Sequence, residues 1–461
     1  MVQSRGGTLS PEEAFVKPIL LLNSGPVGGV LASRHLGNEL NIQNIITSDM
    51  GGTSFDVSMI RNGDILVKSR AEVNGLLTGL TMVDIQAIGA GGGSIAWVDD
   101  RGMPRVGPHS AGSRPGPACY DRGGNEPTAT DVAVALGIID PHSFLGEEMI
   151  LNKGKALGAI EEKLLSRLPN MTVTEAASAV YRLLVSTMSN AVRTVTVQKG
   201  YDPREFTMVA YGGAGGAYIC EICKEVDISK IIVPSLASVY SAYGLLLSDD
   251  LRSYVHTTNW VSGQPFNEVN RLFDEMNTMG VESLTADGYN NEDITIIREV
   301  DMKFAGQIHE MTIQVPNRPL TDRDSAFLEE QFTSQYEALY GSGTAWEEAG
   351  IQMVNCRLTA VGHTKKPKLV SYEGERTDLN MELKGSREVF LPNKGNFQVV
   401  KVYDRTKLTA GMKINGPCII DAPDATIFIP DYGSGSIDSH DNLCIILKNA
   451  AAVQDERYKA V

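Results

Sequence analysis

The sequence lacks any run of about 18 consecutive apolar residues, and its first residues lack the pattern of a signal peptide. It also lacks a surplus of positive charge. In 461 residues, 56 Asp and Glu stand against 41 Lys and Arg, which gives a net charge of −15. No basic run offsets this balance. These absences argue against a membrane-spanning protein and against nucleic acid or an anionic membrane surface as a partner.

Cysteine is scarce as well, with six residues in the chain, too few for a disulfide scaffold. This usage predicts a protein of the reducing cytoplasm. Cys220 and Cys223 form a CxxC pair inside a predicted helix, AYICEICKEV. A structural zinc site needs a second pair of ligands, and no other residues have that spacing. We therefore expect both thiols to be buried residues of a helix.

The composition, 42% hydrophobic and 21% charged, predicts a folded protein, and its local character changes along the chain. Residues 1–260 are rich in Gly, Ala and Val and alternate short apolar strands with helices, which predicts an α/β lobe. Residues 261–365 read as a small α+β module. Residues 366–461 carry short apolar runs broken by Gly, Pro and Asp, which predicts a β-rich terminal domain.

Several elements of the first region have clear boundary signals. Strands are predicted at 42–49, 53–60 and 63–70, with Asn62-Gly63 as a two-residue hairpin turn between the second and third. A long helix is predicted to begin after Thr172 or Thr174 and to end at Gly200. Residues 206–226 predict a strand, a glycine turn and a helix.

The turn in SDMGGTSFDVSMI carries more chemistry than a tight turn needs. Gly51 and Gly52 leave main-chain N–H groups accessible, and Thr53 and Ser54 add hydroxyl donors, so the turn suits a phosphate. A carboxylate such as Asp49 would repel phosphate, so its expected role is to hold Mg²⁺ or the water molecules around it. The alternative interpretation is an ordinary glycine hairpin.

A second glycine turn lies in VAYGGAGGAY, between a predicted strand and a predicted helix. It could accept a phosphate at the start of the helix, or it could let a flat adenosine approach the backbone. The order of its glycines does not match the dinucleotide fingerprint, and no Gly-Lys-Ser/Thr of a P-loop follows. Two further glycine-rich segments, GAGGGS at 89–94 and NSGPVGGVLAS at 23–33, are either anion sites or places of close packing.

The ordered set of motifs resembles one known family, the hydantoinase A family. The residues that carry the resemblance are SGPVGGV, SDMGGTSFDVSMI, VDIQAIGAGGGSIAWVD, SAGSRPGPACY, EPTATD, VQKGYDPREFTMVAYGGAGGAYICEI, IIVPSLASVYSAYGLLLSD, KFAGQIHEMTI and GPCIIDAPDAT. The family includes N-methylhydantoinase A, ATP-dependent 5-oxoprolinase and the ATP-handling subunits of acetone and acetophenone carboxylases. The resemblance extends over essentially the whole chain.

The resemblance implies an ATPase lobe like those of actin, Hsp70 and the sugar kinases, and it implies ATP with Mg²⁺ or Mn²⁺ as cofactors. The implied reaction is phosphorylation of the carbonyl oxygen of a small lactam, hydantoin or ketone. A partner subunit of the hydantoinase B type would then complete ring opening or carboxylation.

The resemblance also implies roles for particular residues. Asp49 is the expected metal ligand, and Asp56 and Asp131 are the other candidate catalytic carboxylates. The phosphates and the adenosine are expected on two groups of residues, namely Gly51, Gly52, Thr53 and Ser54 in the hairpin and Gly212, Gly213 and Gly215 in the second turn.

Three departures from the family pattern leave alternatives open. VQSRGGTLSPEEAF at 2–15 resembles a mid-chain segment of the family, so we expect another polypeptide to supply the usual N-terminal lobe, unless this is a truncated or split form. Gln86 and Tyr218 stand where many members carry histidines, which removes two candidate acid–base or metal groups. The alternatives are a subunit specifically of the ketone carboxylase type and a non-catalytic scaffold or regulatory subunit that retains the fold.

Overall fold

The computed structural model describes residues 1–68, 72–73, 75–78, 80–372 and 383–448. Contacts among them define two compact units. The first unit comprises residues 1–22, 69–82 and 248–366, and the second comprises residues 23–68, 83–247 and 367–461. The division of the chain into three domains, with boundaries after residues 260 and 365, stays a prediction. Residues 69–70 of the third predicted strand, and 373–382 and 449–461 of the predicted β-rich domain, lie outside the described residues.

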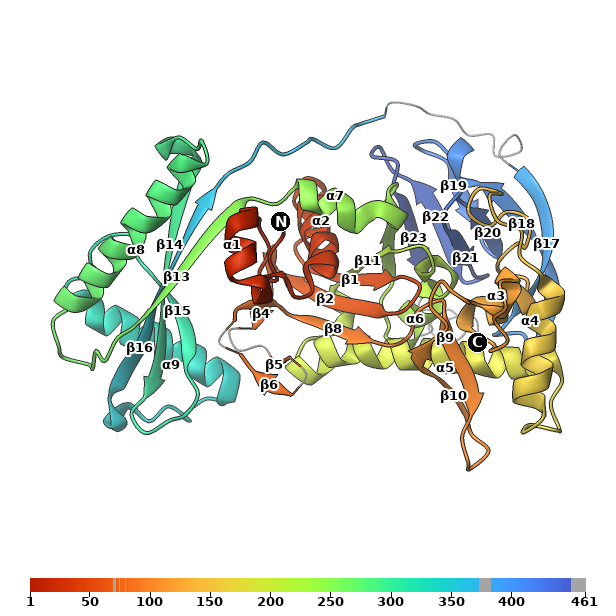
Figure 1. The fold of residues 1–461 in the computed structure, drawn as a ribbon, viewed down its shortest axis with the longest axis horizontal. Helices are drawn as coiled ribbons and strands as arrows, with labels where there is room; N and C mark the ends of the chain where they lie inside the picture. Colours follow the sequence, from red (N-terminus) through yellow and green to blue (C-terminus); the bar gives the residue numbers. More distant parts are fainter. Residues whose placement is uncertain (69–71, 74, 79, 373–382, 449–461) are drawn as a thin grey trace, which may run out of the picture. The chain divides into compact units, whose positions relative to one another are not determined.

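The first unit is built on an antiparallel sheet of four strands in the order β13-β16-β14-β15 (Figure 1). Both long helices of this unit have an apolar side packed on the sheet, with Phe273 and Phe332 buried in a core that also contains Phe304. The element bounds are α1 Pro11–Val16, β13 Asp250–Thr257, α8 Asn267–Ala286, β14 Ile294–Phe304, β15 Met311–Val315, α9 Asp324–Tyr340 and β16 Ile351–Gly362. Residues 261–365, which the sequence predicts to be α+β, contain the helices α8 and α9 and the strands β14, β15 and β16.

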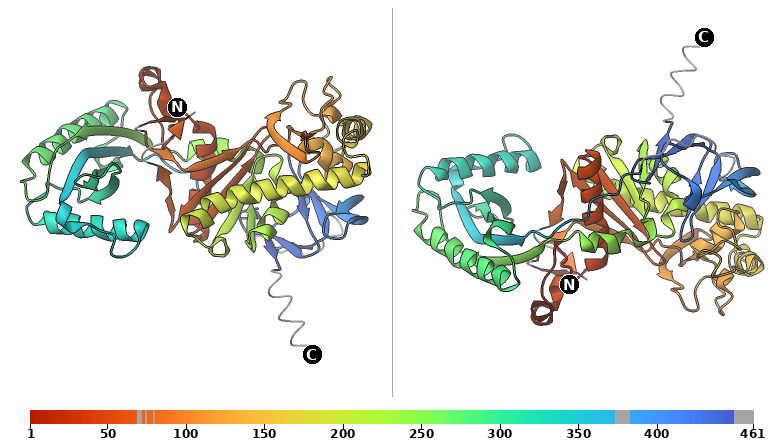
Figure 2. Two further views of the ribbon diagram at one scale, coloured as in Figure 1. Left: turned by 90° about the horizontal axis from the view of Figure 1, so that it is seen from below. Right: turned by 90° about the horizontal axis from the view of Figure 1, so that it is seen from above.

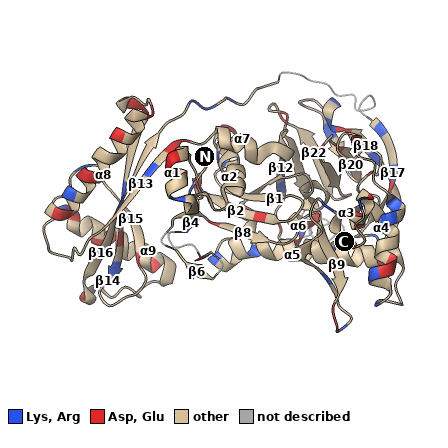
Figure 3. Ribbon diagram, in the orientation of Figure 1, with Lys and Arg blue, Asp and Glu red and all other residues tan. Residues whose placement is uncertain are grey.

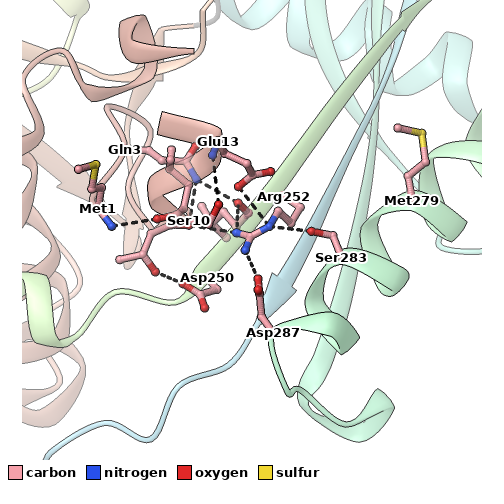
Figure 4. Close-up of polar contacts among 12 residues, drawn as sticks. Met1, Gln3, Ser10, Glu13, Asp250, Arg252, Met279, Ser283 and Asp287 are labelled. Carbon is pink, nitrogen blue, oxygen red and sulfur yellow. Dashed lines mark hydrogen bonds and ion pairs between the residues drawn. The ribbon is translucent and has the colours of Figure 1, made fainter. Parts of the chain in front are cut away.

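A buried arginine joins the N-terminal residues to the rest of the first unit. Arg252 on β13 is 3% exposed and lies 3.4 Å from Glu13 of α1. Its guanidinium also donates to Ser283 at 3.0 Å and to Asp287, both at the end of α8 (Figure 4). Because a buried guanidinium needs such partners, these contacts explain why residues 1–22 belong with residues far along the chain.

The second unit contains a mixed sheet of nine strands. Its main path runs β19-β22-β23-β12-β11-β1-β2-β3, and β8 pairs with β2. The centre is parallel, because β1 pairs with β11 and β11 with β12, whereas β1 and β2 form an antiparallel hairpin. The bounds are β1 Ile45–Met50, β2 Phe55–Arg61, β3 Asp64–Ile65, β8 Ile85–Ile88, β11 Thr207–Tyr211, β12 Lys230–Val233, β19 Lys413–Asn415, β22 Gly433–Ile437 and β23 Leu443–Leu447.

Helices cover both faces of this sheet, which is why the residues of β1 and β11 are nearly all buried (Figures 1 and 2). The bounds are α2 Ser24–Leu40, α3 Ala129–Ala135, α4 Lys153–Ile160, α5 Val173–Val195, α6 Ile219–Glu225 and α7 Tyr240–Leu246. Helix α5 begins with a capping box made by Thr172 and Glu175. It ends at Val195 rather than at Gly200, because Gly200 instead closes the following single turn with φ +82°.

The predicted β-rich region forms strands, but these do not stand apart from the α/β core. Strands β19, β22 and β23 extend the main sheet, and β17 Leu383–Leu391, β18 Asn396–Asp404, β20 Cys418–Asp421 and β21 Thr426–Ile429 form a second sheet. Cys220 and Cys223 are buried in α6, as expected, and the six cysteines are free thiols.

Acidic and basic residues are interspersed along the elements of both units (Figure 3). A search of the described helices finds none long and apolar enough to cross a membrane.

Candidate active site

The hairpin between β1 and β2 places two carboxylates opposite each other. Asp49 and Asp56 are cross-strand partners, and the turn between them is closed by a bond from Gly51 N–H to the carbonyl oxygen of Ser54 at 3.2 Å. Asp56 is 9% exposed and accepts a hydrogen bond from the Ser54 hydroxyl at 2.9 Å. The sequence prediction of a strand, a glycine turn and a second strand is confirmed here.

Burial makes the ionised forms of both carboxylates costly. Desolvation raises the pKa of Asp49 to about 6. A hydrogen bond from the Ser241 hydroxyl at 3.1 Å opposes this rise, and the charge of Asp56 adds to it. Desolvation also raises the pKa of Asp56. Because a bound cation would relieve the cost of ionising both groups, this pair fits a metal ion held by one or two carboxylates together with water and phosphate oxygens.

The second glycine turn lies directly beside this hairpin. Strand β11 runs parallel to β1 and pairs Tyr211 with Asp49, so the turn that follows β11 begins next to the Asp49 carboxylate. Gly212 has φ +82°, and a Cβ there would lie 2.5 Å from the Oδ1 atom of Asp49. Both constraints require glycine at this position. The amide of Ala214 then donates to the carbonyl oxygen of Met50 at 3.1 Å, which ties the two turns together.

A third glycine segment supports the hairpin from another side. The amides of Gly92 and Gly93 donate to the carbonyl oxygens of Gly51 and Gly52 at 3.0 and 2.6 Å. A Cβ on Gly91 would lie 2.5 Å from the amide nitrogen of Thr53. The segment at 89–94, which the sequence left as either an anion site or close packing, therefore uses its amides to fix the hairpin.

These turns meet at a cavity of about 440 Å³ in the second unit. Glycines, hydroxyl-bearing residues and apolar side chains all line it, and Asp424 is the charged residue among them. The lining residues are Gly51, Gly52, Thr53, Gly92, Gly93, Gly112, Ser113, Pro117, Tyr120, Thr130, Ile139, Ser143, Phe144, Leu145, Gly213, Ala214, Ala217, Ala422, Pro423, Asp424, Ala425 and Thr426.

Gly51 and Gly52 face open space in this cavity. A Cβ at either position would meet no atom within 4 Å, and neither residue has a positive φ. The amides of Gly52 and Thr53 donate to no acceptor in the described part of the chain. The protein backbone therefore does not itself require glycine at 51 and 52, whereas a phosphate that approaches these amides closely would require it.

Apart from Asp131, the predicted site residues take two kinds of position. Gly51, Gly52, Thr53 and Gly213 line the cavity, whereas Gly212, Gly215, Ser54, Asp49 and Asp56 belong to the turns and strand ends beside it. The sequence prediction omitted Thr130 and the segment Ala422–Thr426. The segment had a signal, because it lies in the motif GPCIIDAPDAT, but nothing local indicated that it would meet the glycine turns.

Asp131 does not present its carboxylate to the cavity. It is fully buried and accepts four hydrogen bonds at 2.7–3.1 Å, from the amides of Ala118, Cys119 and Thr128 and from the Thr128 hydroxyl. It is the third residue of α3 and forms a capping box with Thr128. This geometry gives Asp131 a positioning role for the loop and for Thr130, and a direct catalytic role remains only a sequence prediction.

The two residues at the expected histidine positions have different environments. Tyr218 is 3% exposed, donates to the carbonyl oxygen of Ala129 at 3.0 Å and stacks on Tyr181 with ring centroids 4.9 Å apart. Gln86 is partly exposed on β8, opposite Val57 of β2. Among the described residues, no group of three or more His, Cys, Asp or Glu side chains could hold a metal ion. A metal ion at this hairpin would therefore have to be held by Asp49 and Asp56 together with oxygen atoms of a ligand.

Comparison with known proteins gives matches over both parts of the chain. Residues 1–253 match the hydantoinase/oxoprolinase family, and residues 259–446 match the hydantoinase/oxoprolinase C-terminal domain. The chain is 30% identical to caprolactamase subunit alpha of Pseudomonas jessenii over 440 residues, which cover 95% of this chain and 63% of that protein. It is 31% identical to the acetophenone carboxylase gamma subunit of Aromatoleum aromaticum over 452 residues, with coverage of 95% and 61%.

Two solved structures resemble the fold. The crystal structure of the ATP-dependent caprolactamase from Pseudomonas jessenii matches with a TM-score of 0.82 and 29% identity, over 94% of this chain and 62% of that chain. A nucleotide-free structure of acetone carboxylase matches with a TM-score of 0.81 and 26% identity, over 97% and 64%. The chain thus spans just under two thirds of the length of these proteins. The predicted α/β class is confirmed, and the chain belongs to the hydantoinase/oxoprolinase family.

Proposed function

We propose that this chain is an ATP-dependent enzyme subunit that phosphorylates the carbonyl oxygen of a small lactam, hydantoin or ketone. Phosphorylation converts a poor electrophile, or a poorly enolised ketone, into a species with a good leaving group or a trapped enol. A hydantoinase B-type partner then opens the ring or carboxylates the product. The observation that carries this proposal is the convergence of two separate glycine turns at one cavity, with Asp49 adjacent to both turns.

The chain offers a phosphate tail two kinds of contact. The free amides of Gly52 and Thr53, with the Thr53 hydroxyl, are donors for phosphate oxygens in the cavity that these residues line. Asp49, with Asp56 behind it, would hold Mg²⁺ or Mn²⁺, which when bound neutralises charge that develops on the transferred phosphoryl group.

The apolar side chains that line the cavity suit the nucleoside. The aromatic rings of Tyr120 and Phe144, together with Ile139 and Leu145, provide an apolar surface for a flat base. The turn at Gly213 lines the same cavity. An arrangement of this kind corresponds to an ATPase lobe of the actin, Hsp70 and sugar-kinase type, which is the lobe architecture that we propose for the second unit.

Partner subunits are part of the proposal. The relatives are named as subunits of caprolactamase and acetophenone carboxylase, and this chain spans only part of their length. We propose that a further polypeptide segment completes the ATP cleft and that a hydantoinase B-type subunit receives the activated substrate. The cysteine content suggests that the complex works in the cytoplasm.

Two other functions have specific support. A ketone carboxylase subunit is favoured by the similarity to acetophenone and acetone carboxylases, and by the absence of histidines at 86 and 218. A non-catalytic scaffold is favoured by the same absence, since two candidate acid–base groups are missing. The substrate panel below separates lactam from ketone chemistry, and failure with every substrate would favour the scaffold.

The test is ADP or AMP release by the complex purified with its partner subunits, measured with a panel of lactams, hydantoins and ketones. We expect release that depends on both Mg²⁺ and substrate, and we expect Asp49→Asn to lower kcat about a hundredfold or more. Asp64→Asn is the matched control, because Asp64 is an exposed carboxylate on β3 and carries the same charge. Undiminished turnover in Asp49→Asn would refute the proposed mechanism.

A further inference from the structure

Two features of the second unit lie outside the cavity lining: the glycine pair Gly28-Gly29 of α2, and the segment around Ser241 and Gly244 of α7. Both helices lie close to Asp49, because Ser241 of α7 donates to its carboxylate and Gly29 of α2 lies against Tyr211, the strand partner of Asp49. The sequence left the α2 glycines as either an anion site or close packing, and the structure shows close packing.

The backbones of α2 and α7 are in direct contact. A Cβ on Gly244 would lie 1.7 Å from the carbonyl oxygen of Gly28, and a Cβ on Gly28 would lie 2.2 Å from the carbonyl oxygen of Ser241. Neither helix could carry a larger residue at this crossing without moving away from the other. The crossing therefore fixes the backbone position of Ser241.

Gly29 makes an equally close contact with the neighbouring strand. A Cβ there would lie 2.3 Å from the ring of Tyr211, and Tyr211 is the β11 residue that pairs with Asp49. The ring of Tyr211 also packs on that of Tyr240, with centroids 4.9 Å apart, and Tyr240 directly precedes Ser241. Two consecutive glycines of α2 thus contact two different neighbours of the same carboxylate.

Ser241 completes the connection. Its hydroxyl donates to the Oδ2 atom of Asp49 at 3.1 Å, while the Oδ1 atom lies beside Gly212. The two oxygens of the carboxylate therefore lie next to two different segments, and Ser241 supplies the hydrogen bond. A metal ligand works best when its rotamer is held by such supporting contacts before the metal binds.

We infer that Ser241 is a positioning residue for Asp49, and that the packing of Gly28 and Gly29 against α7 and Tyr211 holds it in place. The inference rests on the proposed function of Asp49 as the metal-holding carboxylate. It assigns the α2 glycine motif a role at the active site although that motif is absent from the cavity lining.

The test compares Ser241→Ala, which removes the donor, with Ser241→Thr, which keeps it. Ser235→Ala is the control, because Ser235 is an exposed serine on the segment that leads into α7. Substitutions of Gly28 risk misfolding, so the serine variants carry the test. The first readout is Mn²⁺ affinity in the presence of the non-hydrolysable analogue AMP-PNP, measured on the assembled complex from the EPR signal of free Mn²⁺. The second is hydrogen exchange of residues 48–55 in the metal-free full chain.

We expect Ser241→Ala to weaken Mn²⁺ binding about tenfold and to speed exchange at 48–55, with Ser241→Thr within about twofold of the unmodified protein and Ser235→Ala unchanged. Unchanged Mn²⁺ affinity and exchange in Ser241→Ala would overturn the inference, as would a loss in Ser241→Thr as large as that in Ser241→Ala. Failure of the proposed function has a different signature, since the unmodified complex would then bind no Mn²⁺ with AMP-PNP.

Discussion

At the scale of single residues, ionisation of the partly buried Asp49 carboxylate destabilises the folded protein. Its pKa of about 6 lies above the ordinary value of 3.8, so the folded state binds its proton more tightly than the unfolded state does. Such a group makes stability fall as pH rises from about 4 to about 6, and the full cost persists above pH 6. A carboxylate kept at a destabilising position is typical of functional sites.

Replacement of Asp49 by Asn should therefore stabilise the protein at neutral and alkaline pH. The pKa difference sets an upper bound of about 3 kcal/mol, and partial exposure to solvent reduces the expected gain to about 1–2 kcal/mol at pH 8. At pH 4.5 the gain should shrink to about a third, because most of the folded protein is then already protonated at this position. Urea unfolding of the variant and the unmodified protein at pH 8 and at pH 4.5 measures the two gains in stability. An equal gain at both values would show that ionisation of Asp49 is not its cause, and Asp64→Asn should show little change at either.

Gly52 permits a test that separates folding from ligand binding. Because a Cβ there would meet no atom within 4 Å and φ is not positive, Gly52→Ala should leave stability unchanged or raise it by up to about 1 kcal/mol. The methyl group would enter the cavity that Gly52 lines, so ATP affinity should fall at least about tenfold. Thermal unfolding and equilibrium nucleotide binding measure the two effects. Gly158→Ala is the control, since Gly158 on α4 also has open space around it but lies outside the cavity lining. Normal ATP affinity in Gly52→Ala would contradict the phosphate assignment.

At the scale of elements, Asp131 shows how the irregular loop that leads into α3 is held. Four donors from the loop and from the start of α3 converge on its carboxylate. Asp131→Asn keeps the shape of the side chain but replaces an acceptor oxygen by a donor, so at least one buried amide would lose its partner. We expect a loss of about 2–4 kcal/mol in the free energy of unfolding.

Glu175→Gln is a matched comparison for Asp131→Asn, because Glu175 plays the same capping-box role at the exposed start of α5. Its effect should be much smaller, since water can replace a lost partner there. Chemical denaturation of both variants measures the difference. Similar small losses in the two variants would mean that the Asp131 network is not a main support of the loop.

The elements that sequence predicted well are those with local signals. Asn62 and Gly63 both have the positive φ that their hairpin turn requires, and Thr172 with Glu175 marks the start of α5 directly. The prediction that α5 ends at Gly200 was wrong, because Gly200 caps a separate turn that follows the helix. Thr128 caps α3 although Thr130 fits the local sequence pattern equally well, and only tertiary contacts with the loop at 118–119 distinguish the two.

At the scale of the whole molecule, the missing information was which distant segments meet. The pairing of β13 with β16 joins residues about a hundred positions apart, and β23 joins the main sheet beside β12 from more than two hundred positions away. No local periodicity specifies such pairings. The glycine turns at 51–54 and 212–216 could be identified separately, but their common cavity, the support from Gly92 and Gly93, and the contribution of Ala422–Thr426 follow only from the tertiary structure.

The central claim is that the Asp49 hairpin holds the phosphates and metal of Mg·ATP. The most direct measurement is a crystal structure of the assembled complex with Mg²⁺ and AMP-PNP. We predict phosphate oxygens within hydrogen-bond distance of the amides of Gly52 and Thr53, and the metal bound to Asp49 directly or through one water. A nucleotide bound elsewhere, with Asp49 still engaged only by Ser241 and no anion at the hairpin, would contradict the account.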